Sequence, residues 1–264
     1  MSDRREREAV VDALQVRVFD DAAAMGAAAA LDAARALRDA ITARGHAHAM
    51  FATGNSQLGF LAALVHEDGI DWSSVVGFHM DEYVGIAADH PASFRRYLRE
   101  RLVARVPIGE FHFVEGDAAD AGAECIRYAE LLRAHPLDLC CLGIGENGHL
   151  AFNDPPADFA DPLDVKVVAL DDVCRRQQVG EGHFADVDAV PSLAITVTVP
   201  ALLRAGRVLA IVPETRKAEP VRRTLEGAIE ETCPASILRR HPHATLYLDD
   251  ESAGASSSIQ GGRA

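Results

Sequence analysis

Residues suited to proton-transfer chemistry lie together just after one apolar run. Leu137–Ile144 is largely apolar and predicts a buried parallel strand. Glycines then allow close backbone approach to a ligand, and polar side chains accompany them: Gly143, Gly145 and Gly148, with Asn147, His149, Asn153 and Asp154. Ligand sites of open α/β sheets form at the carboxyl ends of strands, so this stretch predicts a site. The alternative is an ordinary strand-to-helix turn in which His149 caps a helix or packs in the core.

A pair of carboxylates follows a second apolar run. Val75–Met80 predicts a strand, and Asp81 and Glu82 come directly after it. Adjacent carboxylates at a strand end are commonly solvated loop residues. Their position after a fully apolar strand favours a place in the site instead.

Two features could bind an anion at the same edge of the sheet. A predicted strand at His46–Ala52 is followed by Thr53, Gly54, Asn55 and Ser56 and then by a helical segment, and free N–H groups at such a helix start attract anions. A loop with one glycine is a weak signal, so a plain turn is the alternative. Lys217 lies in the first turn after a predicted strand at Arg207–Val212, where it either points over the sheet edge or is solvated.

The polar segment Asp171–Gly182 lacks an apolar stripe and contains the Arg175-Arg176 pair. Such a composition suits a lid over a pocket. An ordinary surface helix is the alternative.

The remaining segments alternate between strand and helix patterns. Strands are predicted at Val16–Phe19, Phe111–Val114, Leu163–Leu170, Ala194–Val199 and Thr245–Leu248, and helices at Asp20–Thr42, Gln57–His66, Phe94–Val103, Ala118–Ala134, Pro200–Leu203 and Pro234–Leu238. This alternation predicts one doubly wound, Rossmann-like α/β domain over residues 1–253, with a mostly parallel sheet and helices on both faces. The Gly-, Ser- and Ala-rich residues 254–264 predict a disordered tail.

Composition restricts the partners. The 264 residues carry a net charge of −14, which argues against a nucleic-acid or anionic-membrane surface. The five cysteines show neither CxxC nor zinc-type spacing, so no metal site is expected. An odd cysteine count and the lack of a signal peptide or membrane-length run predict a reducing cytoplasm.

Three separated stretches resemble the glucosamine-6-phosphate deaminase family, within the wider group that includes 6-phosphogluconolactonases. They are Ala52–Ser56, the Met80-Asp-Glu-Tyr-Val-Gly run continued by His90–Ser93, and Gly143–Pro155. The likeness spans residues 15–250. It implies conversion of glucosamine 6-phosphate and water to fructose 6-phosphate and ammonia, with neither metal nor organic cofactor, and is compatible with a homo-oligomer.

The resemblance also implies roles for single residues. Asp81 matches the base that moves a proton between C2 and C1 of the opened sugar, and His149 matches the histidine of ring opening. Asn147 and Asp154 match positions that orient this histidine or relay its protons. Thr53–Ser56 and Lys217 match the phosphate-binding positions.

The chain departs from the family pattern at several of these positions. Asn147 stands where some members have aspartate, and Asp154 where glutamate is common. The lid run Gly182-His183-Phe184 lacks the family's arginine, for which Arg175 or Arg176 could substitute. Ala157 and Asp158 replace the small hydroxyl residues of allosteric members, which argues against allosteric control.

Two other functions stay open. A sugar-phosphate lactone hydrolase of the same group is disfavoured by Tyr83 and Leu150–Asn153, since those enzymes usually carry Asp-Glu-Arg and a Thr-Ala-Ser continuation. A catalytically silent sugar-phosphate sensor is favoured by the departures at Asn147 and Asp154. Retention of both Asp81 and His149 argues against it.

Overall fold

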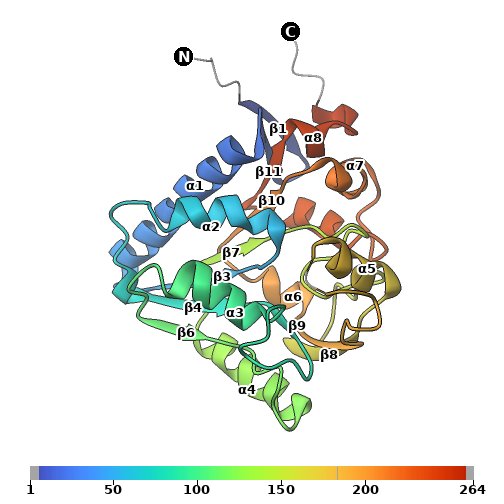
Figure 1. Ribbon diagram of the computed structural model, residues 1–264. Helices are drawn as coiled ribbons and strands as arrows, with labels where there is room; N and C mark the ends of the chain where they lie inside the picture. Colours follow the sequence, from blue (N-terminus) through green and yellow to red (C-terminus); the bar gives the residue numbers. More distant parts are fainter. Residues whose placement is uncertain (1–5, 183, 260–264) are drawn as a thin grey trace.

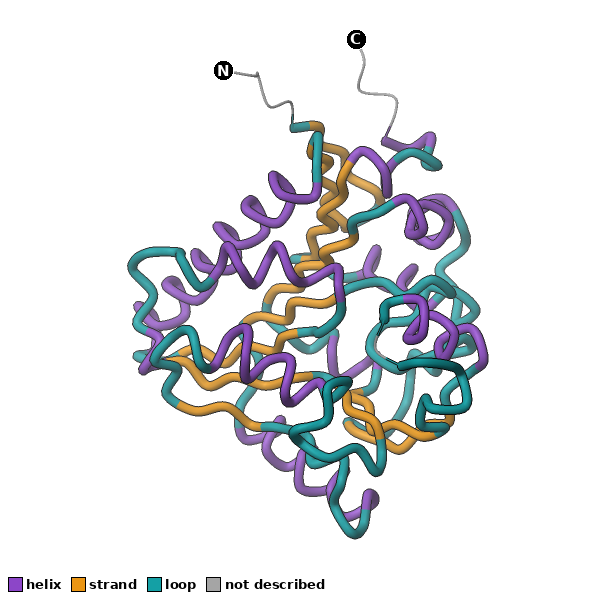
Figure 2. Tube along the Cα trace, in the orientation of Figure 1, coloured by secondary structure: helices purple, strands orange, loops and turns teal. Residues whose placement is uncertain are grey.

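The computed structural model describes residues 6–182 and 184–259. Their largest sheet runs in the order β1-β2-β11-β10-β7-β3-β4-β6 (Figures 1 and 2). β1 is antiparallel to β2, and every other neighbouring pair is parallel. The strands are β1 Arg7–Val11, β2 Leu14–Phe19, β3 Ala47–Phe51, β4 Val75–His79, β6 Glu110–His112, β7 Leu139–Leu142, β10 Arg207–Val212 and β11 Ala244–Asp249.

Helices cover both faces of this sheet, which confirms the doubly wound prediction. The α-helices are α1 Ala22–Arg44, α2 Leu58–Leu64, α3 Phe94–Leu98, α4 Ala121–Ala134, α5 Asp172–Gly180, α6 Val199–Leu202, α7 Ala218–Glu226 and α8 Asp250–Ala253. Side chains of central strand β7 alternate between two cores. Leu139 and Cys141 pack with α1 and α2, whereas Cys140 and Leu142 pack with α4, α6 and α7. Burial on both faces explains why the sequence of this strand is continuously apolar.

A second, antiparallel sheet lies beside the large one. It has the order β5-β9-β8, with β5 Asp81–Tyr83, β8 Val165–Ala169 and β9 Leu193–Val197. Together with α5 it encloses a third apolar cluster, and α5, β8 and β9 lie on the right-hand side of Figure 1. Strand β5 was not predicted, because three residues are too few to show a period.

The end of the described chain differs from the predicted disordered tail. Ser257–Ile259 forms a short 3₁₀ helix, and Ile259 is buried in the main core. Glu226 Oε1 accepts hydrogen bonds from the Ser256 hydroxyl at 3.0 Å and the Ser257 amide at 2.6 Å. One carboxylate and one buried isoleucine therefore order residues 254–259, a contact between distant segments that composition does not reveal. Residues 260–264 lie outside the described chain.

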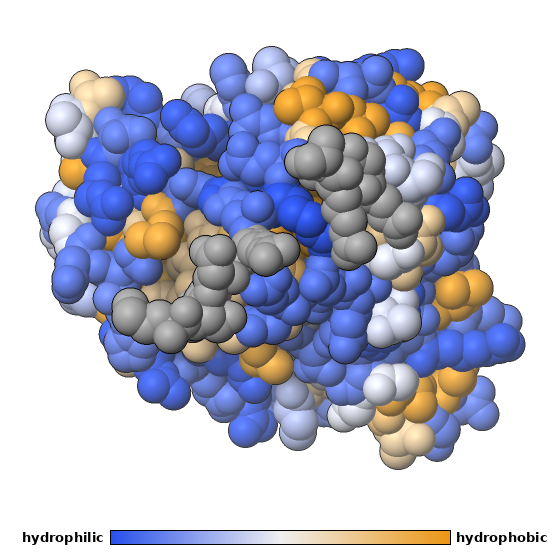
Figure 3. Space-filling model, turned by 90° about the horizontal axis from the view of Figure 1, so that it is seen from above, coloured by the Kyte–Doolittle hydropathy of each residue, from blue (hydrophilic) through white to orange (hydrophobic). Residues whose placement is uncertain are grey.

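The face shown in Figure 3 is mostly hydrophilic, and its hydrophobic residues form small separate patches. Within the described residues, no helix is both long and apolar enough to cross a membrane.

Candidate active site

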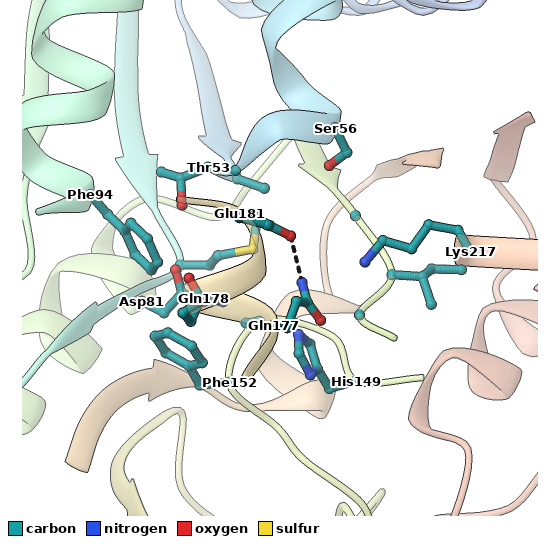
Figure 4. A pocket seen from close by; sticks show the side chains of 17 residues that line it. Thr53, Ser56, Asp81, Phe94, His149, Phe152, Gln177, Gln178, Glu181 and Lys217 are labelled. Atoms are coloured by element: carbon teal, nitrogen blue, oxygen red, sulfur yellow. Dashed lines mark hydrogen bonds between the residues drawn. The ribbon is translucent and has the colours of Figure 1, made fainter. Parts of the chain in front are cut away.

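Four neighbouring strands deliver the predicted site residues to one pocket. β10, β7, β3 and β4 are adjacent, parallel and central in the sheet. Beyond their carboxyl ends lie Lys217, His149, the Thr53–Ser56 loop and Asp81. All four positions contribute to the lining of the same pocket (Figure 4). The expectation that strand ends bring these segments together is therefore confirmed.

Asp81 is the buried acid of this pocket. It begins β5 and keeps only 6% of its surface exposed. Burial disfavours the charged form and raises the pKa of Asp81 well above its usual range, and the neighbouring charge of Glu82 raises it further. A carboxyl group with a raised pKa is a stronger base when it does ionise, which suits removal of a proton from carbon.

Glu82 has a structural task instead. Its carboxylate is fully buried and accepts hydrogen bonds from the Ser93 hydroxyl at 2.7 Å and from the Phe94 and Arg95 amides at 3.1 and 3.0 Å. It thereby satisfies the free N–H groups at the start of α3. This fixes Phe94 in the pocket wall.

His149 packs its ring directly on Gly145. A β-carbon at residue 145 would lie 2.2 Å from His149 Nε2, so only glycine leaves room for the imidazole. The His149 amide donates to Asn147 Oδ1 at 3.0 Å. His149 Nδ1 lies 3.0 Å from Asp154 Oδ1, but the direction of the ring nitrogen misses that oxygen, so the contact is not a directed hydrogen bond.

Asn147 joins the catalytic loop to the start of the lid helix. Its Nδ2 donates to Asp154 Oδ1 at 2.9 Å and to Asp171 Oδ2 at 3.1 Å, and the Asp171 amide donates to Asp154 Oδ2 at 3.2 Å. Burial alone would raise the pKa of Asp154, but His149 and these donors outweigh it and lower the pKa. Asp154 is therefore held as a carboxylate beside His149. The hydrogen bonds of the Asn147 side chain go to Asp154, to Asp171 and to the His149 backbone amide rather than to the imidazole ring.

Three of the four residues of the predicted anion-binding loop lie in the pocket wall, together with Lys217. Thr53, Gly54 and Ser56 line the pocket with Lys217. Gly54 has φ +96°, a backbone conformation that favours glycine, and its carbonyl accepts from the Tyr97 hydroxyl at 2.8 Å. Asn55 instead lines a neighbouring hollow, and its side-chain Nδ2 donates a hydrogen bond to the Glu181 backbone carbonyl at 3.3 Å.

Lys217 is a buried cation at this end of the pocket. Only 3% of its surface is exposed, and burial lowers its pKa, although Glu181 opposes the shift. A buried ammonium group is stabilised by an anion close to it, so the position favours binding of a phosphate group.

The predicted lid segment forms α5 beside the pocket, but neither of its two arginines is among the residues that line the pocket. Arg175 donates to the Val187 and Val190 carbonyls at 2.6 and 3.2 Å, and the Arg176 side chain is 71% exposed. The helical period explains this, because residues 174, 177, 178 and 181 share one face. Of these, Gln177, Gln178 and Glu181 line the pocket. The spacing of the glutamines and the glutamate was the signal that the sequence reading missed.

Glu181 places a carboxylate next to the anion-binding loop. Its Oε1 accepts from Gln177 Nε2 at 2.8 Å and lies 3.5 Å from the Arg216 guanidinium. Figure 4 shows Glu181 between Thr53, Ser56 and Lys217. Arg216, a second cation near the loop, was also missed from the sequence. The neighbouring His183 lies outside the described residues.

Comparisons with known proteins agree with the arrangement of the pocket. A sequence profile described as glucosamine-6-phosphate isomerases/6-phosphogluconolactonase matches residues 20–247. A glucosamine-6-phosphate deaminase of Listeria monocytogenes serotype 4a is 37% identical over 202 residues, covering 76% of this chain and 84% of that protein. Another, from Bacillus thuringiensis, is 36% identical over 200 residues, covering 76% and 74%.

Solved structures show the same relationship. A monomeric glucosamine-6-phosphate deaminase superposes with a TM-score of 0.83 at 30% identity, covering 91% of this chain and 99% of that one. A 6-phosphogluconolactonase from Shewanella baltica gives a TM-score of 0.74 at 22% identity, covering 93% and 100%, and shares the fold. Since the profile spans most of the sequence, the chain belongs to the family of glucosamine-6-phosphate isomerases and 6-phosphogluconolactonases.

Proposed function

We propose that this protein is an aminosugar-phosphate isomerase-deaminase, which converts glucosamine 6-phosphate and water to fructose 6-phosphate and ammonia. The observation that carries the proposal is a single pocket that holds a buried acid, a histidine and an anion-binding loop with a buried lysine. The relatives named glucosamine-6-phosphate deaminase support the same activity.

Ring opening is the first step in this scheme. His149 lines the pocket and moves the proton between the ring oxygen and O1 of the sugar. The Asp154 carboxylate lies 3.0 Å from Nδ1 of this ring, and Asn147 holds Asp154 in place. Asp154 thus reaches His149 although its side chain is one methylene group shorter than the glutamate that is common at this position.

Asp81 then carries out the isomerisation. Its carboxylate takes the proton from C2 of the open-chain sugar and returns it to C1, while one proton of the amine passes to O1, which leaves an imine at C2 and a hydroxyl group at C1. Water adds to that imine and ammonia departs, giving the ketose phosphate. Lys217 and the Thr53–Ser56 loop hold the phosphate group throughout, so that C1 and C2 stay at Asp81.

The deciding experiment measures ammonia release from a panel of hexosamine 6-phosphates by purified protein. Ammonia release by the wild type, and its loss in Asp81→Asn, is the expected result. Hydrolysis of 6-phosphogluconolactone without ammonia release would identify a lactonase. Calorimetric binding of sugar phosphates without turnover of either compound would identify a sensor.

We also propose that the enzyme acts in the cytoplasm on a small molecule, without nucleic acid. The five cysteines are free and buried, and the net charge of −14 repels polyanions. A homo-oligomer stays a prediction, which sedimentation of the purified protein tests.

A further inference from the structure

The pocket wall holds a thiol that the proposed reaction does not use. Cys174 on α5 lies beside the His149–Asp154 pair. A ring nitrogen of His149, a carboxylate oxygen of Asp154 and Cys174 Sγ all lie within 4.8 Å of one another. The first two groups come from the loop after β7 and the third from the lid helix, so spacing along the sequence does not reveal the cluster.

One of these groups lacks the hydrogen-bond partner that buried polar atoms normally have. His149 is more than nine-tenths buried, and its Nδ1 makes no hydrogen bond within the described part of the chain. Cys174 is fully buried among apolar side chains of the third cluster. The Asp154 carboxylate lies 3.0 Å from the unpaired ring nitrogen. The surroundings are those of a site that would be stabilised by a cation.

We propose that His149, Asp154 and Cys174 bind a divalent transition-metal ion of the zinc or cobalt class, and that the bound ion inhibits the enzyme. The donor set of one nitrogen, one oxygen and one sulfur suits such ions. Mg²⁺ and Ca²⁺ prefer oxygen ligands alone. Binding releases the thiol proton to solvent as the metal–sulfur bond forms.

The geometry requires only a small adjustment. Tetrahedral zinc with bonds of about 2.0–2.3 Å places its ligand atoms roughly 3.3–3.5 Å apart. The Nδ1–Oδ1 distance of 3.0 Å is already close to this value. Cys174 Sγ lies within 4.8 Å of both other ligand atoms and must therefore approach by no more than about 1.5 Å, a shift on the scale of a side-chain rotation or a slight movement of α5. The ion enters from the pocket, which His149 lines.

Inhibition follows from which atoms the ion occupies. It takes Nδ1 of His149 and the Asp154 carboxylate, the pair assigned to ring opening, and it joins the catalytic loop to the lid helix. The inhibition, but not the binding, rests on the proposed function. Binding is therefore tested without substrate.

The test is cobalt titration of the apo protein followed by ultraviolet and visible absorption. Wild-type protein and Cys125→Ser, a control at a buried cysteine on α4, should both develop a thiolate-to-cobalt charge-transfer band that saturates near one equivalent. Cys174→Ser should lack the band. A band of equal strength in Cys174→Ser, or no band in the wild type, would overturn the proposal.

X-ray absorption of zinc-loaded wild type provides a readout that does not depend on a variant folding. One sulfur at about 2.3 Å with nitrogen or oxygen ligands at about 2.0 Å is expected, and a shell without sulfur or with several sulfurs contradicts the site. In the activity assay, zinc should inhibit the wild type reversibly, and a chelator should restore the rate. If the metal-free wild type shows no deaminase activity, that outcome counts against the proposed function, but the spectroscopic test of metal binding still stands.

Discussion

Asp81 and Glu82 are adjacent acidic residues, yet their side chains lie on opposite faces of β5. One faces the pocket and the other caps α3 from the interior. The capping donors partly offset the burial that raises the pKa of Glu82, whereas for Asp81 the neighbouring charge adds to the effect of burial. The strand thus separates a reactive acid from a structural one within two residues.

The raised pKa of Asp81 sets the acid limb of the activity profile. A base must be deprotonated to act, so kcat/KM should fall as the pH drops through a value well above that of an ordinary carboxyl group. Asp81→Asn should lower the rate by roughly 10²–10⁴ and abolish exchange of the C2 hydrogen with solvent. The measurement is deuterium exchange over a pH series, and wild-type exchange in the mutant would remove Asp81 from the mechanism.

Lys217 should determine affinity for the phosphate group. Lys217→Ala removes a charged hydrogen bond, worth about 1.5–3 kcal/mol, and should raise KM roughly ten- to a hundred-fold. The exposed Arg176→Ala serves as the control and should leave KM unchanged. Equal calorimetric affinities of Lys217→Ala and the wild type for a sugar phosphate would place the phosphate elsewhere.

Gly145 should prove essential for its lack of a side chain. Gly145→Ala puts a β-carbon 2.2 Å from His149 Nε2, so the imidazole must leave its position. We expect kcat to fall by about 10²-fold or more, as for loss of a positioned acid or base, with phosphate affinity nearly unchanged. Gly180→Ala is the matched control, since its β-carbon would meet nothing within 4 Å. Normal turnover by Gly145→Ala would contradict the assigned role of the ring.

Helix α5 presents one face to the pocket, and Glu181 at its end lies beside the anion-binding loop. Glu181→Gln should therefore strengthen binding of inorganic phosphate. A like charge about 4 Å away costs about 1 kcal/mol even with the screening of water, so the gain is roughly fivefold or more. Isothermal titration calorimetry measures it, with Glu130→Gln on the exposed side of α4 as the control. Weaker phosphate binding by Glu181→Gln would show that the carboxylate assists the anion-binding loop by holding Arg216 in position.

The parallel arrangement of the central strands was readable from the sequence, but their order was not. Alternating strand and helix patterns predicted parallel strands whose ends meet, glycine-containing breaks marked two of those ends, and a pair of carboxylates marked a third. The lid was harder, because a helix with polar residues all round shows no apolar stripe. Its inward face depends on the neighbours that Gln177, Gln178 and Glu181 meet, which are distant in sequence.

Asp81 also influences the stability of the whole folded chain. The folded chain binds the Asp81 proton more tightly than the unfolded chain does, because the folded-state pKa is raised. Its stabilising contribution is full below the ordinary carboxyl pKa and is lost as the pH rises through the raised value. Asn cannot ionise, so Asp81→Asn should unfold at a higher temperature than the wild type at neutral pH and lose that advantage near about pH 4.

Calorimetry at both pH values tests this, with the exposed Asp68→Asn as the control. A stability difference between Asp81→Asn and the wild type that is the same at both pH values would contradict the raised pKa.

The sequence predicted disorder for residues 254–259, whereas the structure shows them folded against the rest of the molecule. Ile259 and Glu226 hold that segment through a contact between distant parts of the chain, which the local composition does not reveal.

The strand order has a consequence for synthesis on the ribosome. β2 precedes β11, its parallel partner, by more than two hundred residues, and β11 is the last strand in the part of the chain that the structure describes. Until Ala244–Asp249 leaves the exit tunnel, the β1–β2 hairpin has no place in the large sheet and the edge of β10 is open. A nascent chain of this protein must therefore keep two unpaired strand edges from pairing with other chains until β11 has been made.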